Sequence, residues 1–180
     1  MKKILSPLLT LSLLITFLSC SENDGPELIQ EEEVITSIIV TLQSGSDTVT
    51  LSSVDLDGDG PNEPIIDVLG SLNSNTTYSG AVKFLNESIS PVEDITEEVA
   101  EEAEEHQVFY SFTSPISSVV TSDTDSSGNP LGLVFTLTTG NAGNATLGLT
   151  LRHEPKKPNT GILDAGGETD VAVTFSVSVE

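Results

Sequence analysis

Apolar and polar residues alternate along much of the chain after residue 33. The clearest case is the C-terminal run Val171–Val179, in which every odd-numbered residue is apolar and the residues between them are small or polar. Strict alternation that is rich in Val and Thr predicts β-strands with one buried and one solvated face. The same period indicates further strands at residues 34–42, 48–51, 78–85, 107–113, 133–138 and 147–152.

Clusters of Gly, Asn, Asp, Ser and Pro separate these runs, as at Ser44–Ser46 and Gly140–Asn144, and such residues form tight turns. A parallel sheet buried on both sides would give continuous apolar runs instead, so the alternation favours antiparallel sheets. We therefore expect a mostly β fold: one antiparallel, immunoglobulin-like β-sandwich of about 7–8 strands. Its single domain would span residues 34–180.

One segment has helical rather than strand spacing. Val92, Ile95, Val99 and Ala103 form a narrow apolar stripe, and the residues around them are mostly acidic. Either Ser90 with Glu93 or Asp94 with Glu97 has the spacing of a capping box, which marks a helix start. The spacing predicts one acidic helix at about 92–106, inserted between two strands.

The N-terminus consists of two lysines and an apolar run that closes at Cys20. The run is shorter than the roughly 20 residues of a membrane span, so it predicts a signal peptide at 1–19. Ser19-Cys20 resembles the bacterial lipobox, which implies cleavage before Cys20 and attachment of a lipid anchor to its sulfur. The alternative is a plain signal peptide with a chance cysteine.

Residues 20–33 are polar and acidic, which predicts a lipidated tether outside the folded core. Acids directly after the lipid cysteine resemble surface-export signals of Bacteroidetes lipoproteins. This implies a lipid-anchored location at the outer membrane, exposed at the cell surface, with the periplasmic face as the alternative.

Charge and cysteine content narrow the classes of partner. The chain has 6 basic and 28 acidic side chains, a net charge of −22, and loss of Lys2 and Lys3 with the signal peptide leaves 4 − 28 = −24. Such a charge repels nucleic acids and attracts cations. Cys20 is the sole cysteine, so internal disulfides are excluded and the core or bound ions must stabilise the fold.

The stretch DLDGDGPNEP matches the first half of an EF-hand calcium loop, with Asp55, Asp57 and Asp59 at alternate positions before a glycine. The second half fails, because the twelfth position is not an acid. Glu63 and Asp67 are the candidates for a late ligand. The alternative is a turn whose acids bond to its own backbone amides.

A weaker version of this pattern contains Asp123, Asp125 and Ser127 before a glycine. It is a second candidate calcium loop, although a hairpin loop of this composition needs no metal.

A transition-metal site is the other metal hypothesis. Glu102 and His106 lie one helical turn apart in the predicted helix, and His153 follows a strand. Histidine with carboxylate ligands suits zinc and related metals. The alternative is a solvated acidic helix face with His106 in its last turn, where a cation is favoured.

Several segments together resemble a group of small uncharacterised Bacteroidetes lipoproteins: DLDGDGPNEP, TTYSGAVKFLNES, EDITEEVAEEAEEHQ, NPLG with LTTG, LRHEPKKPN and AGGETDVAVTF. The resemblance covers about Glu31 to Glu180. Some members carry the label "type 1 periplasmic binding fold", which implies two α/β lobes; one helix among alternating strands argues against that fold here.

Established catalytic motifs such as G-x-S-x-G, the P-loop and H-E-x-x-H are missing from the sequence. We therefore expect a non-catalytic, monomeric surface lipoprotein, stabilised by calcium, that binds the membrane through Cys20 and an unknown protein or glycan partner. The alternatives are a periplasmic ligand-binding lipoprotein and a metal-dependent enzyme that uses His106 and His153.

Overall fold

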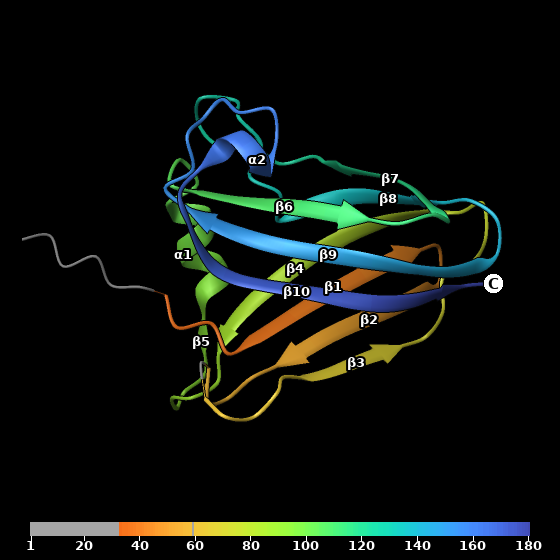
Figure 1. Cartoon of the computed structure of the whole chain (residues 1–180), viewed down its shortest axis with the longest axis horizontal. Helices are drawn as coiled ribbons and strands as arrows, with labels where there is room; N and C mark the ends of the chain where they lie inside the picture. Colours follow the sequence, from red (N-terminus) through yellow and green to blue (C-terminus); the bar gives the residue numbers. More distant parts are fainter. Residues whose placement is uncertain (1–32, 59) are drawn as a thin grey trace, which may run out of the picture. The chain divides into compact units, whose positions relative to one another are not determined.

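Two antiparallel β-sheets pack face to face in the computed structural model, which describes residues 33–58 and 60–180 (Figure 1). Within these residues, the larger sheet has seven strands in the order β3-β2-β1-β4-β8-β7, with β5 beside β4. The smaller sheet has three strands in the order β10-β9-β6. The predicted mostly β, antiparallel sandwich is confirmed.

The strands of the larger sheet are β1 (Ser37–Ser44), β2 (Asp47–Val54), β3 (Ile65–Leu69), β4 (Thr77–Asn86), β5 (Glu93–Asp94), β7 (Ile116–Thr121) and β8 (Val134–Thr139). Those of the smaller sheet are β6 (His106–Phe112), β9 (Gly143–His153) and β10 (Glu168–Val179). The helices are α1 (Ile95–Glu101) and α2 (Ile162–Ala165).

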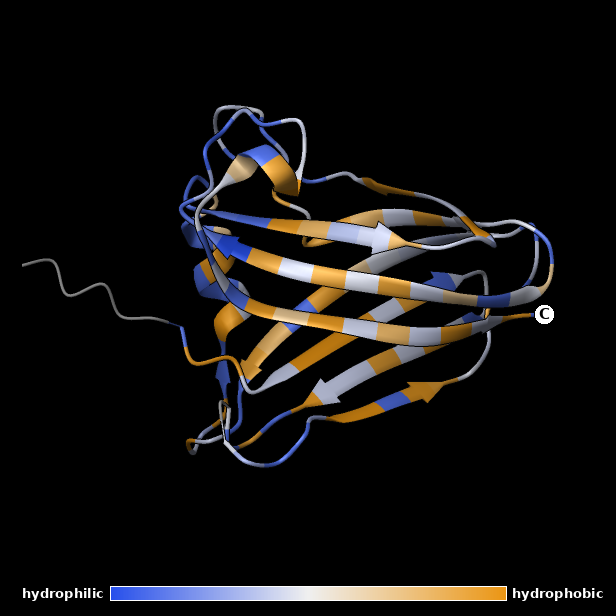
Figure 2. Cartoon of the chain, in the orientation of Figure 1, coloured by the Kyte–Doolittle hydropathy of each residue, from blue (hydrophilic) through white to orange (hydrophobic). Residues whose placement is uncertain are grey.

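Alternation along the strands builds the core between the sheets. In β4, Tyr78, Gly80, Val82 and Phe84 are buried while the residues that alternate with them are exposed, and β10 buries Phe175 and Val177 in the same way. Figure 2 shows the resulting change between apolar and polar residues along the longer strands, such as β9 and β10. Each large apolar side chain that is fully buried contributes about 1.5–3 kcal/mol, so these positions hold the two sheets together.

The described residues contain ten strands rather than seven or eight, because three of them lack a readable pattern. Strand β3 is an edge strand, in which only Val68 is partly buried. Strand β5 has two residues, and β7 contains a register shift between Ile116 and Ser118. Alternation reports burial of one face, so strands with two exposed faces or a bulge escape it.

Helix α1 is shorter than the predicted helix at 92–106. Asp94 caps its start by accepting a hydrogen bond from the Thr96 amide, while Val92 is exposed and lies outside the helix. The helix ends at Glu101, and His106 opens strand β6 instead of closing the helix. The acids at 102, 104 and 105 explain the early end, because negative charge is unfavourable at a helix C-terminus.

The predicted signal peptide, Cys20 and residues 20–32 of the predicted tether lie outside the described residues, as does Asp59. Neither α1 nor α2 is long and apolar enough to cross a membrane.

Candidate metal centre

Two histidines lie next to each other at one end of the smaller sheet, where β6 begins and β9 ends. His106 is the first residue of β6 and His153 the last of β9, and the antiparallel register pairs them directly. Two positions along, Val108 and Leu151 are also paired, and both are buried in the core. Because side chains two residues apart share a face, the two imidazoles lie on the inner face of the sandwich.

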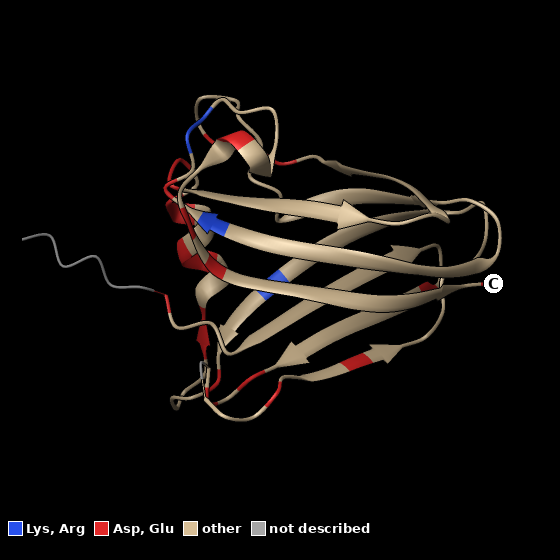
Figure 3. Cartoon of the chain, in the orientation of Figure 1, with Lys and Arg blue, Asp and Glu red and all other residues tan. Residues whose placement is uncertain are grey.

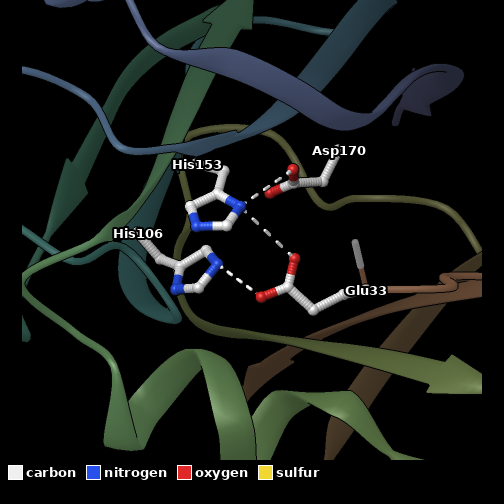
Figure 4. A group of neighbouring side chains, drawn as sticks. All are labelled: Glu33, His106, His153 and Asp170. Carbon is white, nitrogen blue, oxygen red and sulfur yellow. Dashed lines mark ion pairs between the residues drawn. The ribbon is translucent and has the colours of Figure 1, made fainter. Parts of the chain in front are cut away.

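A β-bulge brings a carboxylate to the histidines. The pairing between β10 and β9 shifts between Thr169 and Val171, so Asp170 is an extra residue without its own partner. Strict alternation from the inward Val171 would direct Asp170 outward; a bulge re-aims the side chain. Figure 4 shows Asp170 pointing toward His153.

The second carboxylate comes from the segment that leads into β1 of the larger sheet. Glu33 lies four residues before β1, and its side chain is only 3% exposed. One oxygen, Oε1, lies 2.8 Å from His106 Nε2, and the other lies 3.8 Å from His153 Nδ1. The cluster thus joins residues of β6, β9, β10 and the segment before β1.

The four side chains surround one point (Figure 4). Each of Glu33, His106, His153 and Asp170 offers a ligand atom within 4.8 Å of the other three. Asp170 Oδ1 lies 3.9 Å from His153 Nδ1, and the two imidazole rings stack with centroids 4.7 Å apart. A second, more exposed group is formed by Glu105, Glu154 and the same His153.

Hydrogen bonding orients His106 toward this point. Its Nδ1 lies 3.3 Å from the backbone oxygen of Glu102, which places a proton on Nδ1 and leaves Nε2 with a free lone pair in the neutral ring. A histidine that ligates a metal through one nitrogen commonly donates the other N–H to a backbone carbonyl. His106 therefore has the arrangement expected of a ligand.

Several buried polar atoms of the cluster lack hydrogen-bond partners among the described residues. These atoms are Glu33 Oε2, His106 Nε2 and Asp170 Oδ2. The 2.8 Å approach of Glu33 to His106 is an ion-pair distance without hydrogen-bond geometry. Buried polar atoms are otherwise nearly always satisfied, so three unpartnered atoms within one cluster make it a candidate site for a bound ion.

The electrostatics of the cluster also favour a cation. No Lys or Arg nitrogen of the described residues lies within ion-pair distance of Glu33 or Asp170. Burial first, and then the charge of Glu33, raise the pKa of Asp170 to about 6, against the opposing effect of the histidines. Burial and then the charge of Glu33 also raise the pKa of Glu98 on α1. Figure 3 shows the acids gathered at this end.

The donor set indicates the class of metal. Two imidazole nitrogens and two carboxylate oxygens suit Zn²⁺ and neighbouring transition metals, whereas Mg²⁺ and Ca²⁺ prefer oxygen alone. In a tetrahedral zinc site, with bonds of about 2.0–2.1 Å, ligand atoms lie ~3.3 Å apart. The distances of 2.8, 3.8 and 3.9 Å here fall on either side of that value, so small side-chain shifts would complete the site.

The carboxylates of this centre differ from the one proposed from the sequence. The structure brings His106 and His153 together, but the Glu102 side chain is exposed and only its backbone oxygen contacts His106. The sequence places Glu33 in the predicted tether, and Asp170 lies just before the predicted strand at 171–179 with no predicted role. The positions 33, 106, 153 and 170 have no motif spacing, because the long-range strand register and the bulge assemble them.

The described acids of the first candidate calcium loop stay apart. None of Asp55, Asp57, Glu63 and Asp67 belongs to a metal-ligand group within residues 33–58 and 60–180. The Asp57 carboxylate accepts a 2.6 Å hydrogen bond from the Asn62 side chain, and Asp67 lies on the edge strand β3.

In the second candidate loop, backbone amides satisfy the acids. Asp123 accepts hydrogen bonds from the amides of Gly132 and Leu133, at 2.9 and 2.8 Å. Asp125 accepts from the Ser127 and Asn129 amides, at 3.0 and 2.8 Å. The Ser127 hydroxyl donates to Glu104 rather than facing the two aspartates. These bonds are those of an Asx-rich turn.

A pocket of about 420 Å³ borders the metal centre, and Glu33 and Asp170 are part of its lining. Comparison with known proteins finds no matching family model, no matching curated protein and no matching solved structure.

Proposed function

We propose that the protein is an exported lipoprotein whose β-sandwich binds one divalent transition-metal ion of the Zn²⁺ class. The ligands are Glu33, His106, His153 and Asp170. The observation that carries the proposal is the convergence of four ligand atoms within 4.8 Å, three of whose side chains hold a buried polar atom without a hydrogen-bond partner.

The number of donors supports a binding role rather than catalysis. A structural zinc site has four protein ligands, whereas a catalytic site has three and leaves a position for water. Four side chains are available here, and His106 is fully buried. We therefore propose a transition metal, rather than calcium, as the ion that stabilises this non-catalytic module. A metal-dependent enzyme that uses His106 and His153 is the alternative.

The location at the membrane rests on the sequence. The apolar run that ends at Cys20 and the acidic residues after it support a lipid-anchored protein at the outer membrane surface. Labelling of cells with a palmitate analogue tests this part. We expect the label on the wild-type chain and its loss from Cys20→Ala; label on both chains would contradict the anchor.

The metal is tested by calorimetric titration of the full chain, purified in detergent and stripped with a chelator. We expect one Zn²⁺ per chain and no binding of Mg²⁺. Glu33→Gln and His153→Ala should each weaken Zn²⁺ binding at least about tenfold, since even the outer-shell partners of metal ligands contribute 10–100-fold. The matched control is Glu97→Gln, an exposed acid on α1 with the same charge change.

Two results would overturn the proposal. One is the failure of wild-type protein to bind Zn²⁺ above the level of nonspecific binding to acids. The other is equal affinity in wild type, Glu33→Gln and Glu97→Gln, because the ion would then be held elsewhere.

A further inference from the structure

The segment before β1 has few bonds of its own. We call Glu33–Thr36 the lead-in segment. Thr36 is fixed to the larger sheet, because its amide donates to Leu85 O at 2.9 Å and its carbonyl accepts from the Asp55 amide at 2.7 Å. Among the described residues, no backbone–backbone hydrogen bond holds Glu33, Val34 or Ile35.

The metal centre is where the lead-in segment contacts the smaller sheet. His106, His153 and Asp170 come from all three strands of that sheet, whereas Glu33 belongs to the chain that enters β1 of the larger sheet. The pocket of about 420 Å³ lies along this junction. One part of its lining is Val34, Ile35 and Ile38, and another is the stretch 169–172 of β10.

Without an ion, the packing of Ile35 against the core still holds part of the lead-in segment, but the end at Glu33 brings two acids together. The carboxylates of Glu33 and Asp170 approach the same nitrogen, His153 Nδ1, at 3.8 and 3.9 Å, and like charges held so close repel each other. Glu33 Oε2 and Asp170 Oδ2 are unpartnered acceptors, so they cannot form a hydrogen bond with each other when both carboxylates are ionised. A divalent cation between them turns this repulsion into attraction.

We propose that the bound metal fastens the lead-in segment to the smaller sheet, and that loss of the metal releases the segment and opens the pocket beside it. This inference rests on the proposed metal binding and adds a consequence: metal occupancy and access to the pocket are coupled. The coupling is reciprocal. If the metal weakens the binding of a ligand in the opened pocket by some factor, that ligand weakens the binding of the metal by the same factor.

Limited proteolysis of the full chain with a glutamyl endopeptidase tests the release of the lead-in segment. The protease must accommodate the Glu33 side chain to cut the Glu33–Val34 bond, and a metal-bound carboxylate is withheld from it. We expect cleavage at this bond to be at least about tenfold slower with saturating Zn²⁺ than with chelator. The product spanning residues 34–180 is identified by its mass.

Two controls separate protection from other effects of zinc. The Glu101–Glu102 bond lies at the exposed end of helix α1, and neither side chain bonds to the lead-in segment within the described residues, so it should be cut at one rate in both conditions. In Asp170→Asn, Zn²⁺ should no longer protect the Glu33–Val34 bond, whereas Glu97→Gln should behave as wild type. If Asp170→Asn does not fold, the wild-type titration suffices, because the midpoint of protection must coincide with the calorimetric midpoint.

The possible results separate this inference from the proposed function. Stoichiometric Zn²⁺ binding without protection of the Glu33–Val34 bond would overturn the clamp and leave the metal site standing. Absence of Zn²⁺ binding would overturn both.

Discussion

Two neighbouring groups of acids differ in whether hydrogen-bond donors and a lysine compensate their negative charge. In the loop that contains Asp123 and Asp125, backbone amides donate to both carboxylates, and Lys157 Nζ lies 3.3 Å from Asp125. In the metal centre, Glu33 and Asp170 have no amide or lysine donors among the described residues, and one oxygen of each is unpartnered. Lys157 also donates to the backbone oxygen of His106 and so connects the two groups.

Acid content alone does not distinguish the two groups; the unpartnered oxygens of Glu33 and Asp170 do, and they support the proposed metal site. The loop has the sequence pattern of a calcium site, yet its own backbone uses the carboxylates. The metal centre has no local pattern, yet its ligand atoms are left free and converge. The predictions below test this contrast from the largest effect to the smallest.

The largest effect is expected from Zn²⁺ on wild-type stability. An ion that binds only the folded state stabilises it by mass action, by about 4 kcal/mol when free Zn²⁺ is roughly 1,000 times the dissociation constant. Urea unfolding with Zn²⁺ and with chelator measures this gain. Glu33→Gln should lose most of it, and an equal gain in both proteins would contradict the assignment of Glu33.

The next effect concerns the satisfied loop. Asp125→Ala leaves the amides of Ser127 and Asn129 without their side-chain acceptor and removes one of the acceptors of Lys157, so we expect a loss of about 1–3 kcal/mol. The gain from Zn²⁺ should be unchanged in this variant. If Asp125→Ala kept full stability but lost its response to Zn²⁺, the metal would bind at this loop and not at the cluster of Glu33 and Asp170.

A pH dependence follows from the same loop. Burial opposes ionisation of Asp125, but hydrogen bonds from Asn129 and Lys157 outweigh it and hold its pKa below 3.8. A carboxyl with a lowered folded pKa contributes stability that is complete above its unfolded pKa and is lost as pH falls through the folded value. The difference in unfolding free energy between wild type and Asp125→Asn should therefore be constant near neutral pH and shrink below pH 3.8. A difference that grows on acidification would refute this.

The smallest effect is expected at the first candidate calcium loop. Asp57 is exposed and bonds to the side chain of Asn62, so Asp57→Asn should change stability by less than about 0.5 kcal/mol. We also expect millimolar Ca²⁺ to leave the melting temperature of wild type unchanged. A clear rise with Ca²⁺ that Asp57→Asn removes would restore this loop as the ion site.

The sequence predicts the sandwich well because burial of one strand face leaves a direct trace in the order of residues. Val171–Val179 alternate and make up most of β10, and the buried Ile95 and Val99 mark α1. The metal centre leaves no such trace. The sequence identifies His106 and His153 as possible metal ligands, but only the strand register pairs them. The position of the Asp170 side chain depends on a bulge, and that of Glu33 depends on the path of the chain before β1.

Anomalous X-ray scattering at the zinc absorption edge, from crystals of the protein grown with Zn²⁺, tests the central claim most directly. We expect one strong peak per chain, about 2.0–2.2 Å from His106 Nε2, His153 Nδ1 and an oxygen of each of Glu33 and Asp170. Crystals that contain zinc but show no peak at this position, or show the strongest peak among Asp55, Asp57 and Glu63, would contradict the account.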